Sequence, residues 1–274
     1  MFLIVIFWGI STGDVIFYGI TITISLHSHE PRRRVMSDNR QPTAGHDNMS
    51  TPTPTLALAE CAGRIADLEK RSWQGVAPTP ALRRTRRHIQ SSRCYSSDWK
   101  LCPSDYYALS LDERKAILGA HSTSQLCKAC LFENKNYKPD DDPADAVSDP
   151  TNSRYYLVVV QYVESINVKR LASELRGLRP SGPTRFDPGY FADLRLAPEE
   201  DSERLTGFGH NGVSPFGMLD RTIPVILCQS VRGVSPRFIW MGGGDRDWKL
   251  GMAVGEFVRG VGAIVLDVSE PRTV

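Results

Sequence analysis

The chain has 274 residues, with 33 lysines and arginines against 31 aspartates and glutamates, and therefore a formal net charge of +2. Its content of 41% hydrophobic and 23% charged residues is close to the average of globular proteins, which excludes a wholly disordered chain, a collagen-like chain and a polytopic membrane protein. Six cysteines in a chain of this length are too few for a disulfide scaffold, so we expect reduced thiols.

The N-terminal segment differs from the rest of the chain. Residues 1–26 are apolar and rich in β-branched side chains, and the basic cluster Arg32–Arg34 follows them. Such a segment is long enough to span a bilayer, and the arginines would then hold the remainder in the cytoplasm. Asp14 opposes this interpretation, because an acid near the middle of a span costs about 2.5–3.5 kcal/mol. The alternative is that translation starts at Met36 or Met49. Under both interpretations we predict a cytoplasmic protein, which is membrane-anchored only if residues 1–26 are genuine.

Two further segments precede the expected domain. Residues 27–54 are rich in Pro, Ser, Thr, Asn and Arg without apolar periodicity, which predicts a disordered linker. Residues 55–73 are predicted to form a helix, because apolar residues such as Ile65 and Leu68 recur at helical spacing. The repeat is too short to establish a coiled coil, so packing on the protein's own domain and self-association through residues 56–72 both stay open.

Residues 74–100 form a basic arm. It carries Arg83, Arg84, Arg86 and Arg87 close together, with no acidic residue between Leu82 and Arg93. Such an arm can lie along phosphates, but runs of this kind are more often solvated linkers. We therefore expect an RNA contact here only if another part of the chain argues for nucleic acid.

The folded part is expected over residues 101–270. The expected helices are 111–118, 167–178 and 253–259, the expected strands are 154–163, 222–228, 238–241 and 263–268, and a helix end is expected to run into a strand over 124–132. Because these strands and helices alternate without a regular βαβ repeat, they predict one compact α+β domain.

Familiar catalytic constellations are not supported. Cys127 and Cys130 have C-x-x-C spacing, but a zinc site needs a second pair of ligands and a redox motif should be exposed, so two buried structural thiols are favoured. Of the histidines only His121 and His210 fall within the expected core, and no G-x-S-x-G elbow is present. We predict no metal site.

Two glycine loops and one lysine are more informative. Residues 206–218 contain four glycines and a proline, and Gly242–Asp245 contains three consecutive glycines. Such loops let backbone N–H groups approach a ligand, although neither has a nucleotide-binding pattern. Lys128 lies in an apolar run, where a buried ammonium needs an anion or a carbonyl unless it points outward.

Several segments together carry a resemblance: Leu205–Met218, Ile223–Leu227 and Ile239–Leu250 in this order and spacing, with Lys128 upstream, and Ser104–Tyr107, Leu126–Lys128, Glu133–Asn134 and Tyr155–Tyr162 before them. From about Leu101 to Val268 the chain resembles the YbaK/prolyl-tRNA synthetase-associated editing domain family, and specifically its eukaryotic branch. The resemblance implies a mixed, barrel-like β-sheet with surrounding helices.

The resemblance also implies an activity. Members of this family hydrolyse the ester between a wrongly attached small amino acid and the 3′ end of a transfer RNA, most often tRNA(Pro), and they act in trans. The implied chemistry uses no metal, no cofactor and no covalent nucleophile, because the substrate's own ribose hydroxyl helps to activate water. The implied partners are aminoacyl-tRNA and an aminoacyl-tRNA synthetase. The rival hypothesis is a catalytically silent tRNA- or synthetase-binding module of the same fold.

The implied site residues fall into three groups. The catalytic group is Lys128, Gly212, Val213, Ser214 and Pro215; the substrate-binding group is His210, Asn211, Gly242, Gly243, Gly244 and Asp245; and the tRNA-backbone group is Arg83, Arg84, Arg86 and Arg87. In this assignment the loop amides hold the aminoacyl group and Lys128 positions the terminal nucleotide.

Two departures from the bacterial pattern bear on this assignment. Asn211 stands where the first glycine of G-x-x-x-P is expected. Asp245 and Trp248–Lys249 replace a Lys-Arg-Gly-Leu-Asp-like run, which changes the local charge. Substrate preference therefore does not transfer.

Overall fold

The computed structural model describes residues 54–139, 149–179 and 186–272. The predicted apolar segment (1–26) and nearly all of the predicted linker (27–54) lie outside the described residues, so both stay predictions. Among the helices of the described ranges, none combines the length and the apolar character that a bilayer span requires.

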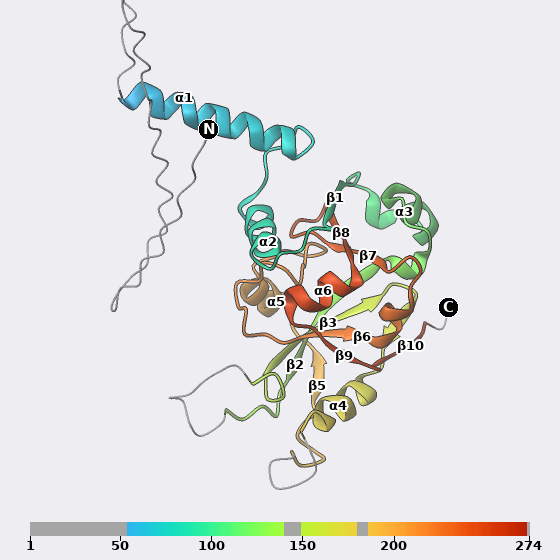
Figure 1. Cartoon of the computed structure of the whole chain (residues 1–274). Coiled ribbons are helices and arrows are strands. Elements are labelled where there is room, and N and C mark those ends of the chain that lie inside the picture. The colour runs from blue at the N-terminus through green and yellow to red at the C-terminus, as the bar shows by residue number, and fades with distance from the viewer. Residues whose placement is uncertain (1–53, 140–148, 180–185, 273–274) are drawn as a thin grey trace, which may run out of the picture. The chain divides into compact units, whose positions relative to one another are not determined.

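The described part of the chain mixes helices and strands (Figure 1). The α-helices are α1 (Pro54–Ser72), α2 (Pro80–Ser91), α3 (Leu111–Leu118), α4 (Val168–Gly177), α5 (Glu199–Thr206) and α6 (Val254–Val261). The strands are β1 (Asp98–Leu101), β2 (Cys127–Asn134), β3 (Tyr155–Gln161), β4 (Glu164–Ile166), β5 (Leu194–Leu196), β6 (Val225–Cys228), β7 (Phe238–Gly242), β8 (Trp248–Ala253), β9 (Ile264–Leu266) and β10 (Ser269–Pro271). Short 3-10 turns lie at Tyr106–Ala108 (η1), Thr123–Gln125 (η2) and Gln229–Gly233 (η4).

Three sheets organise these strands. The largest has the order β5-β2-β3-β6-β9, with β2 antiparallel to β5 and β3, and with β6 parallel to β3 and β9. The second sheet, β1-β8-β7, is antiparallel, and a small third sheet pairs β10 with β4. A single parallel bridge between Leu126 and Trp240 joins the first two sheets next to the start of β2. This arrangement confirms the predicted α+β class with a mixed sheet.

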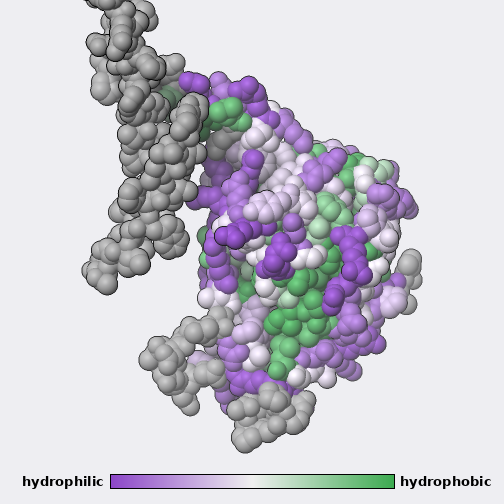
Figure 2. Space-filling model, viewed as in Figure 1, coloured by the Kyte–Doolittle hydropathy of each residue, from purple (hydrophilic) through white to green (hydrophobic). Residues whose placement is uncertain are grey.

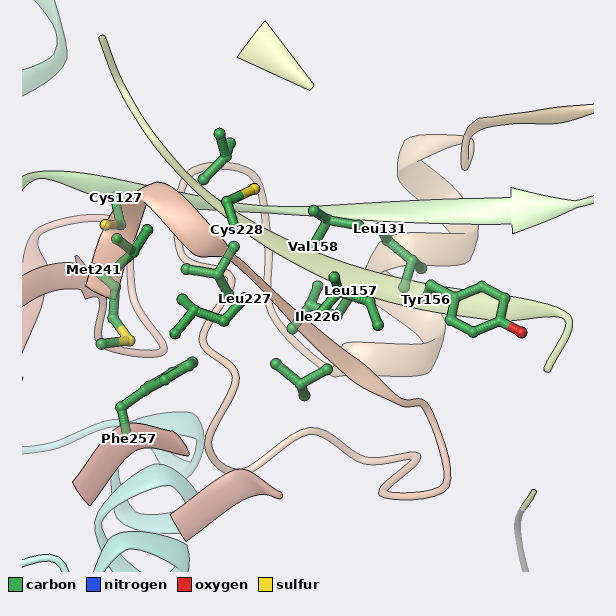
Figure 3. Close-up of a cluster of buried hydrophobic side chains, with 14 of the residues drawn as sticks. Cys127, Leu131, Tyr156, Leu157, Val158, Ile226, Leu227, Cys228, Met241 and Phe257 are labelled. Atoms are coloured by element: carbon green, nitrogen blue, oxygen red, sulfur yellow. The ribbon is translucent and has the colours of Figure 1, made fainter. Parts of the chain in front are cut away.

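The core is built around β3. All seven residues of β3 are buried, as a strand covered on both faces requires, and this explains its continuous apolar sequence. Figure 3 shows side chains of β2, β3 and β6 in one cluster, with Met241 of β7 and Phe257 of α6 pointing toward Leu227. In the view of Figure 2 an apolar band lies over β9, where Ile264 and Val265 are half-exposed. Hydrophilic side chains surround this band.

Most expected elements are confirmed. The helix at 111–118 is α3 with the expected bounds, and the expected helices at 55–73, 167–178 and 253–259 are α1, α4 and α6. The expected strands are β3, β6, β7 and β9, and the segment at 124–132 is η2 followed by β2. Strand β8 was not expected, because no strand was predicted between the expected strand 238–241 and the expected helix 253–259.

The interpretation of residues 74–100 as a solvated linker is wrong, whereas their role as a basic arm stays a prediction. This stretch contains α2 and β1, so the fold begins before residue 101. Thr79 caps α2 by accepting a bond from the Leu82 N–H at 3.3 Å, and a proline opens the helix. Leu82, Thr85 and Ile89 lie on its buried face, and the arginines occupy the rest of its surface.

A tryptophan anchors the end of α1. Trp73 is 3% exposed, and its ring meets Trp99 and Trp248 edge-on at centroid distances of 4.9 and 5.0 Å. Closer to the N-terminus of α1, the side chains of Ile65 and Leu68 are 60% and 58% exposed. The apolar stripe of this helix is therefore not packed on its own domain, and self-association through residues 56–72 stays a proposal.

Candidate functional site

A cleft of about 410 Å³ opens beside β2. Strand β5 pairs with β2 only from Phe132 onward, and the bridge to β7 lies at Leu126, so the stretch 127–130 between them borders the cleft. The lining residues are Tyr107, Cys127, Lys128, Ala129, Cys130, Leu131, Tyr162, Leu196, Ala197, Glu199, Ser202, Phe208, Gly209, His210, Asn211, Val213 and Gly242.

The cleft brings together part of the predicted site. Lys128, His210, Asn211, Val213 and Gly242 all line it. The other predicted members of the two loops, namely Gly212, Ser214, Pro215, Gly243, Gly244 and Asp245, do not line it. Of these, Gly212, Ser214 and Gly244 make contacts that link the loops or close the first one.

Residues 207–217 form a closed loop, which we call the cleft loop. The N–H groups of Leu219 and Asp220 donate to the carbonyls of Thr206 and Leu205, at 3.1 and 2.9 Å, and thereby join the two ends. Phe216 is fully buried and anchors the loop in the core. Compact loops with adjacent ends and their own packed side chains frequently carry function.

Helix α2 braces both ends of the cleft loop. The Arg84 guanidinium donates to the carbonyls of Gly207, at 2.8 Å, and Gly217. The Gly217 N–H donates to Nδ1 of His88 at 2.8 Å. Burial, and next the charge of Arg221, lower the pKa of His88, which favours the neutral imidazole that this bond needs.

The predicted tRNA-backbone arginines therefore differ in surroundings. Arg84 differs from the other three, because its Nε and one terminal nitrogen donate to the protein's own carbonyls, and its phosphate contact stays a prediction. Arg86 lies over the ring of Trp73 and donates to Ser72 Oγ at 3.2 Å. Arg87 is exposed, and Arg83 is half-buried.

The tip of the cleft loop adopts a left-handed turn. Asn211 has φ = 64°, and its carbonyl accepts a bond of 2.7 Å from the Tyr107 hydroxyl. Glycine adopts this backbone region freely, and asparagine is among the few other residues that adopt it at low cost. The conformation therefore gives a physical reason why asparagine can replace the glycine of the bacterial pattern.

The two glycine loops meet backbone to backbone. The Gly244 N–H donates to the Gly212 carbonyl at 3.0 Å. A Cβ added at Gly242 would overlap the carbonyl oxygen of Val213, so this approach requires glycine. Ser214 is fully buried and its Oγ accepts from the Phe216 N–H at 3.2 Å, which makes it part of the loop's internal bonding.

Backbone donors remain available at the cleft. Four cleft-lining residues of the loop, namely Gly209, His210, Asn211 and Val213, have N–H groups that donate to no acceptor within the described residues. Successive N–H groups beside a left-handed residue form concave sites that attract oxyanions. The loop can therefore bind a negatively charged oxygen.

Charged side chains mark two sides of the cleft. Lys128 is half-buried, its Nζ lies 5.9 Å from the centroid of the Tyr162 ring, and no ion pair of the described chain includes it. At the exposed rim, His210 Nδ1 lies 3.1 Å from a Glu199 carboxylate oxygen. The ammonium of Lys128 is thus able to pair with an anionic group of a ligand.

The thiols of the cleft are poor nucleophiles. Burial raises the pKa of both Cys127 and Cys130, so each stays protonated near neutral pH. Both are free thiols; Cys127 is buried as predicted, whereas Cys130 is half-buried. In the described ranges no group of three or more His, Cys, Asp or Glu side chains could hold a metal ion.

Sequence reasoning missed Lys249 as a residue of this region. It is 4% exposed, and its Nζ lies 5.0 and 4.7 Å from the ring centroids of Tyr106 and Tyr107. Burial lowers its pKa to about 8, while the charges of Cys102, Asp247 and Asp245 oppose this shift. Nothing local in the sequence signals the burial, because the covering tyrosines lie about 140 positions earlier.

Solved structures share this arrangement of elements. One is a candidate trans-editing enzyme for prolyl tRNA synthetase, with a TM-score of 0.52 at 20% identity over 70% of this chain and 99% of that chain. The chain has a YbaK-like fold. A scaffold protein from a study of epitope backbone grafting by computational design gives a TM-score of 0.52 at 18% identity over 71% of this chain and 100% of that chain.

Comparisons of sequence add nothing to this assignment. No protein-family model and no curated protein matches the chain. At identities of 18–20% the likeness establishes the YbaK-like fold alone, so any function must be argued from the cleft.

Proposed function

We propose that this chain hydrolyses the ester bond of mischarged aminoacyl-tRNA, acting in trans on small amino acids attached to tRNA(Pro). The observation that carries the proposal is the cleft itself, which Lys128 and four loop residues with available N–H groups line together. The candidate trans-editing enzyme of the same fold supports the reaction class. The cleft volume of about 410 Å³ falls within the range of small-molecule sites.

The backbone donors supply the main stabilisation in this proposal. Attack of water on the ester carbonyl places negative charge on its oxygen, and fixed N–H donors stabilise that charge without reorganisation. Loss of one such donor typically costs about 10²–10³ in rate. The buried contacts of the cleft loop with α2, Tyr107 and Gly244 hold these donors before the substrate binds.

Lys128 supplies the electrostatic anchor. Its ammonium has no carboxylate partner among the described residues, so it can pair with a phosphate of the terminal nucleotide. The proposed reaction needs no side-chain base, because the ribose hydroxyl of the substrate activates the water. Protonated thiols and a rim histidine that faces Glu199 are consistent with this division of labour.

A tRNA-binding surface on α2 completes the proposal. Of the four predicted arginines, exposed Arg87 is the best placed to meet a phosphate, whereas Arg84 braces the cleft loop. We expect Arg87→Ala to lower the salt slope of tRNA binding by about 0.7–0.9, the value of one lost phosphate contact. An unchanged slope would remove α2 from the RNA contact.

The decisive experiment is single-turnover deacylation of Ala-tRNA(Pro) and Cys-tRNA(Pro) by the full chain. We expect release that depends on Lys128, so that Lys128→Ala loses it while keeping the fold. Lys169→Ala is the matched control, because Lys169 is an exposed lysine of α4 outside the cleft. No release above the uncatalysed rate, with tRNA still bound, would instead favour a silent tRNA- or synthetase-binding module.

A further inference from the structure

Lys249 is a buried ammonium that the proposed reaction does not use. Its backbone lies opposite Gly242 in the β7–β8 ladder, at the start of the turn that carries the three glycines. Its Nζ donates to the carbonyl of Arg246 within that turn. The side chain is therefore attached at both ends to the turn 242–249, which we call the glycine turn.

The same ammonium reaches the other loop through one tyrosine. Its Nζ lies 4.7 Å from the centroid of the Tyr107 ring, a cation–π distance. The hydroxyl of that tyrosine donates to the Asn211 carbonyl at 2.7 Å. Asn211 is the left-handed residue at the tip of the cleft loop, among the cleft-lining residues whose N–H groups are available.

We propose that Lys249 is a positioning residue of the cleft, which fixes the glycine turn directly and the cleft loop through Tyr107. As far as it concerns catalysis, this inference rests on the proposed hydrolase function. The residue does not touch the cleft, because Tyr107 and Gly242 lie between them. It acts by setting where the two backbones meet.

Burial of the charge argues against a purely space-filling role. An ammonium in a largely apolar site is expensive, and a hydrophobic side chain of similar volume would often be neutral or stabilising there. Tyr106, Tyr107 and a backbone carbonyl contact the ammonium, and the last two lead to cleft-forming backbone. The contacts of the ammonium with backbone that forms the cleft therefore give a reason why a charged residue is buried here.

The surroundings of Lys249 set the pH at which it loses its charge. Cys102, Asp245 and Asp247 favour the charged form of Lys249, whereas Arg114 from α3 disfavours it. Lys100 lies opposite Lys249 on β1. Tyr106 and Tyr107 stay neutral, because burial raises the pKa of both hydroxyls. The balance lowers the pKa of Lys249 to about 8. Positioning by the charged form should then weaken as pH rises through this value.

The test is a double-mutant cycle on the full chain with Lys249→Met and Tyr107→Phe. Tyr107→Phe keeps the ring but removes the bond to Asn211, so it cuts the proposed connection without removing the charge. Amide hydrogen exchange of residues 207–217 reports on the cleft loop directly. We expect each variant to speed this exchange about fivefold, as loss of one hydrogen bond does. The double variant should be no faster than the faster single variant.

Deacylation provides the second readout. We expect kcat to fall about tenfold or more in either variant while KM changes less than about twofold, because positioning of the donors acts in the transition state. Corrected for the uncatalysed rate, wild-type kcat should fall as pH rises through about 8. The profile of Lys249→Met should lack this fall, and exposed Lys169→Met should behave as wild type.

The two readouts separate the two proposals. If wild type does not deacylate but the exchange cycle is non-additive, the proposed function fails and the positioning role stands. Unchanged exchange in Lys249→Met, or effects that multiply in the double variant, would overturn the positioning role. If Lys249→Met does not fold, exchange of wild type and Tyr107→Phe from pH 7 to 9 decides. Above about pH 8, amide exchange of the cleft loop should then rise more than the intrinsic exchange rate does in wild type, and not in Tyr107→Phe.

Discussion

Removal of the buried ammonium should change how stability depends on pH. In Lys249→Met the titrating group is lost, whereas in wild type its pKa is lowered by burial from 10.5 to about 8. Each unit of pKa corresponds to about 1.4 kcal/mol, so below pH 8 the charged form costs the folded state about 3 kcal/mol. The side chain is 4% exposed, so solvent screening reduces this value little.

The sign follows from proton counting. Below about pH 8 both the folded and the unfolded chain carry the proton, and the full cost applies. Between about 8 and 10.5 the folded chain has released the proton while the unfolded chain still binds it, so the free energy of unfolding rises with pH. Relative to Lys249→Met, wild type should therefore gain about 3 kcal/mol over this interval.

Urea unfolding of both proteins at several pH values from 7 to 10.5 measures the effect. The difference between the two is needed, because burial raises the pKa of groups such as Cys127 and Tyr156, which lowers the stability of both proteins over the same range. A difference that stays flat from pH 8 to 10.5 would refute the reasoning. A rise confined to values below pH 8 would do the same.

Substitutions at three further positions test the cleft backbone. Asn211→Gly should leave the free energy of unfolding within about 1 kcal/mol of wild type. Asn211→Val should lower it by about 1–2 kcal/mol, because β-branched residues adopt φ = 64° poorly. Equal urea midpoints for wild type and Asn211→Val would contradict this. Gly242→Ala should cost about 2–4 kcal/mol, because its Cβ would meet a backbone carbonyl, and Gly255→Ala, with no atom within 4 Å, is the control that should cost nothing. Arg84→Lys should speed amide exchange of the cleft loop about fivefold, because one amine cannot replace a guanidinium that bridges two carbonyls. If Arg84→Lys instead lowers the salt slope of tRNA binding with no change in exchange, the brace is not its role.

The elements with strong local signals could be predicted from the sequence. Strand β3 has an uninterrupted β-branched and aromatic run, and α3 has a serine cap at Ser110 and a terminal Gly119, so each carries its own boundaries. Lys128 and the cleft loop were singled out from the sequence, the resemblance supplied their implied roles, and the cavity brings part of that set together.

The missed elements depend on distant parts of the chain. The apolar positions Leu82 and Ile89 of α2 are visible in the sequence, but the density of arginines made a solvated arm the simpler interpretation. What determines the role of Arg84 is its contact with Gly217, 133 positions later. The burial of Lys249 likewise depends on Tyr106 and Tyr107, which no window around Lys249 contains.

The separation between α2 and the loop that it braces also has a consequence for synthesis. Arg84 leaves the ribosome 133 residues before Gly217, which at about 5–20 residues per second is roughly 7–27 s. For that time the helix has its basic face but not the backbone carbonyls that Arg84 binds. The brace can therefore form only after Gly217 has been synthesised. A chain that begins at residue 101 would never acquire the brace, so such a fragment should fold around β3 yet leave the cleft loop loose.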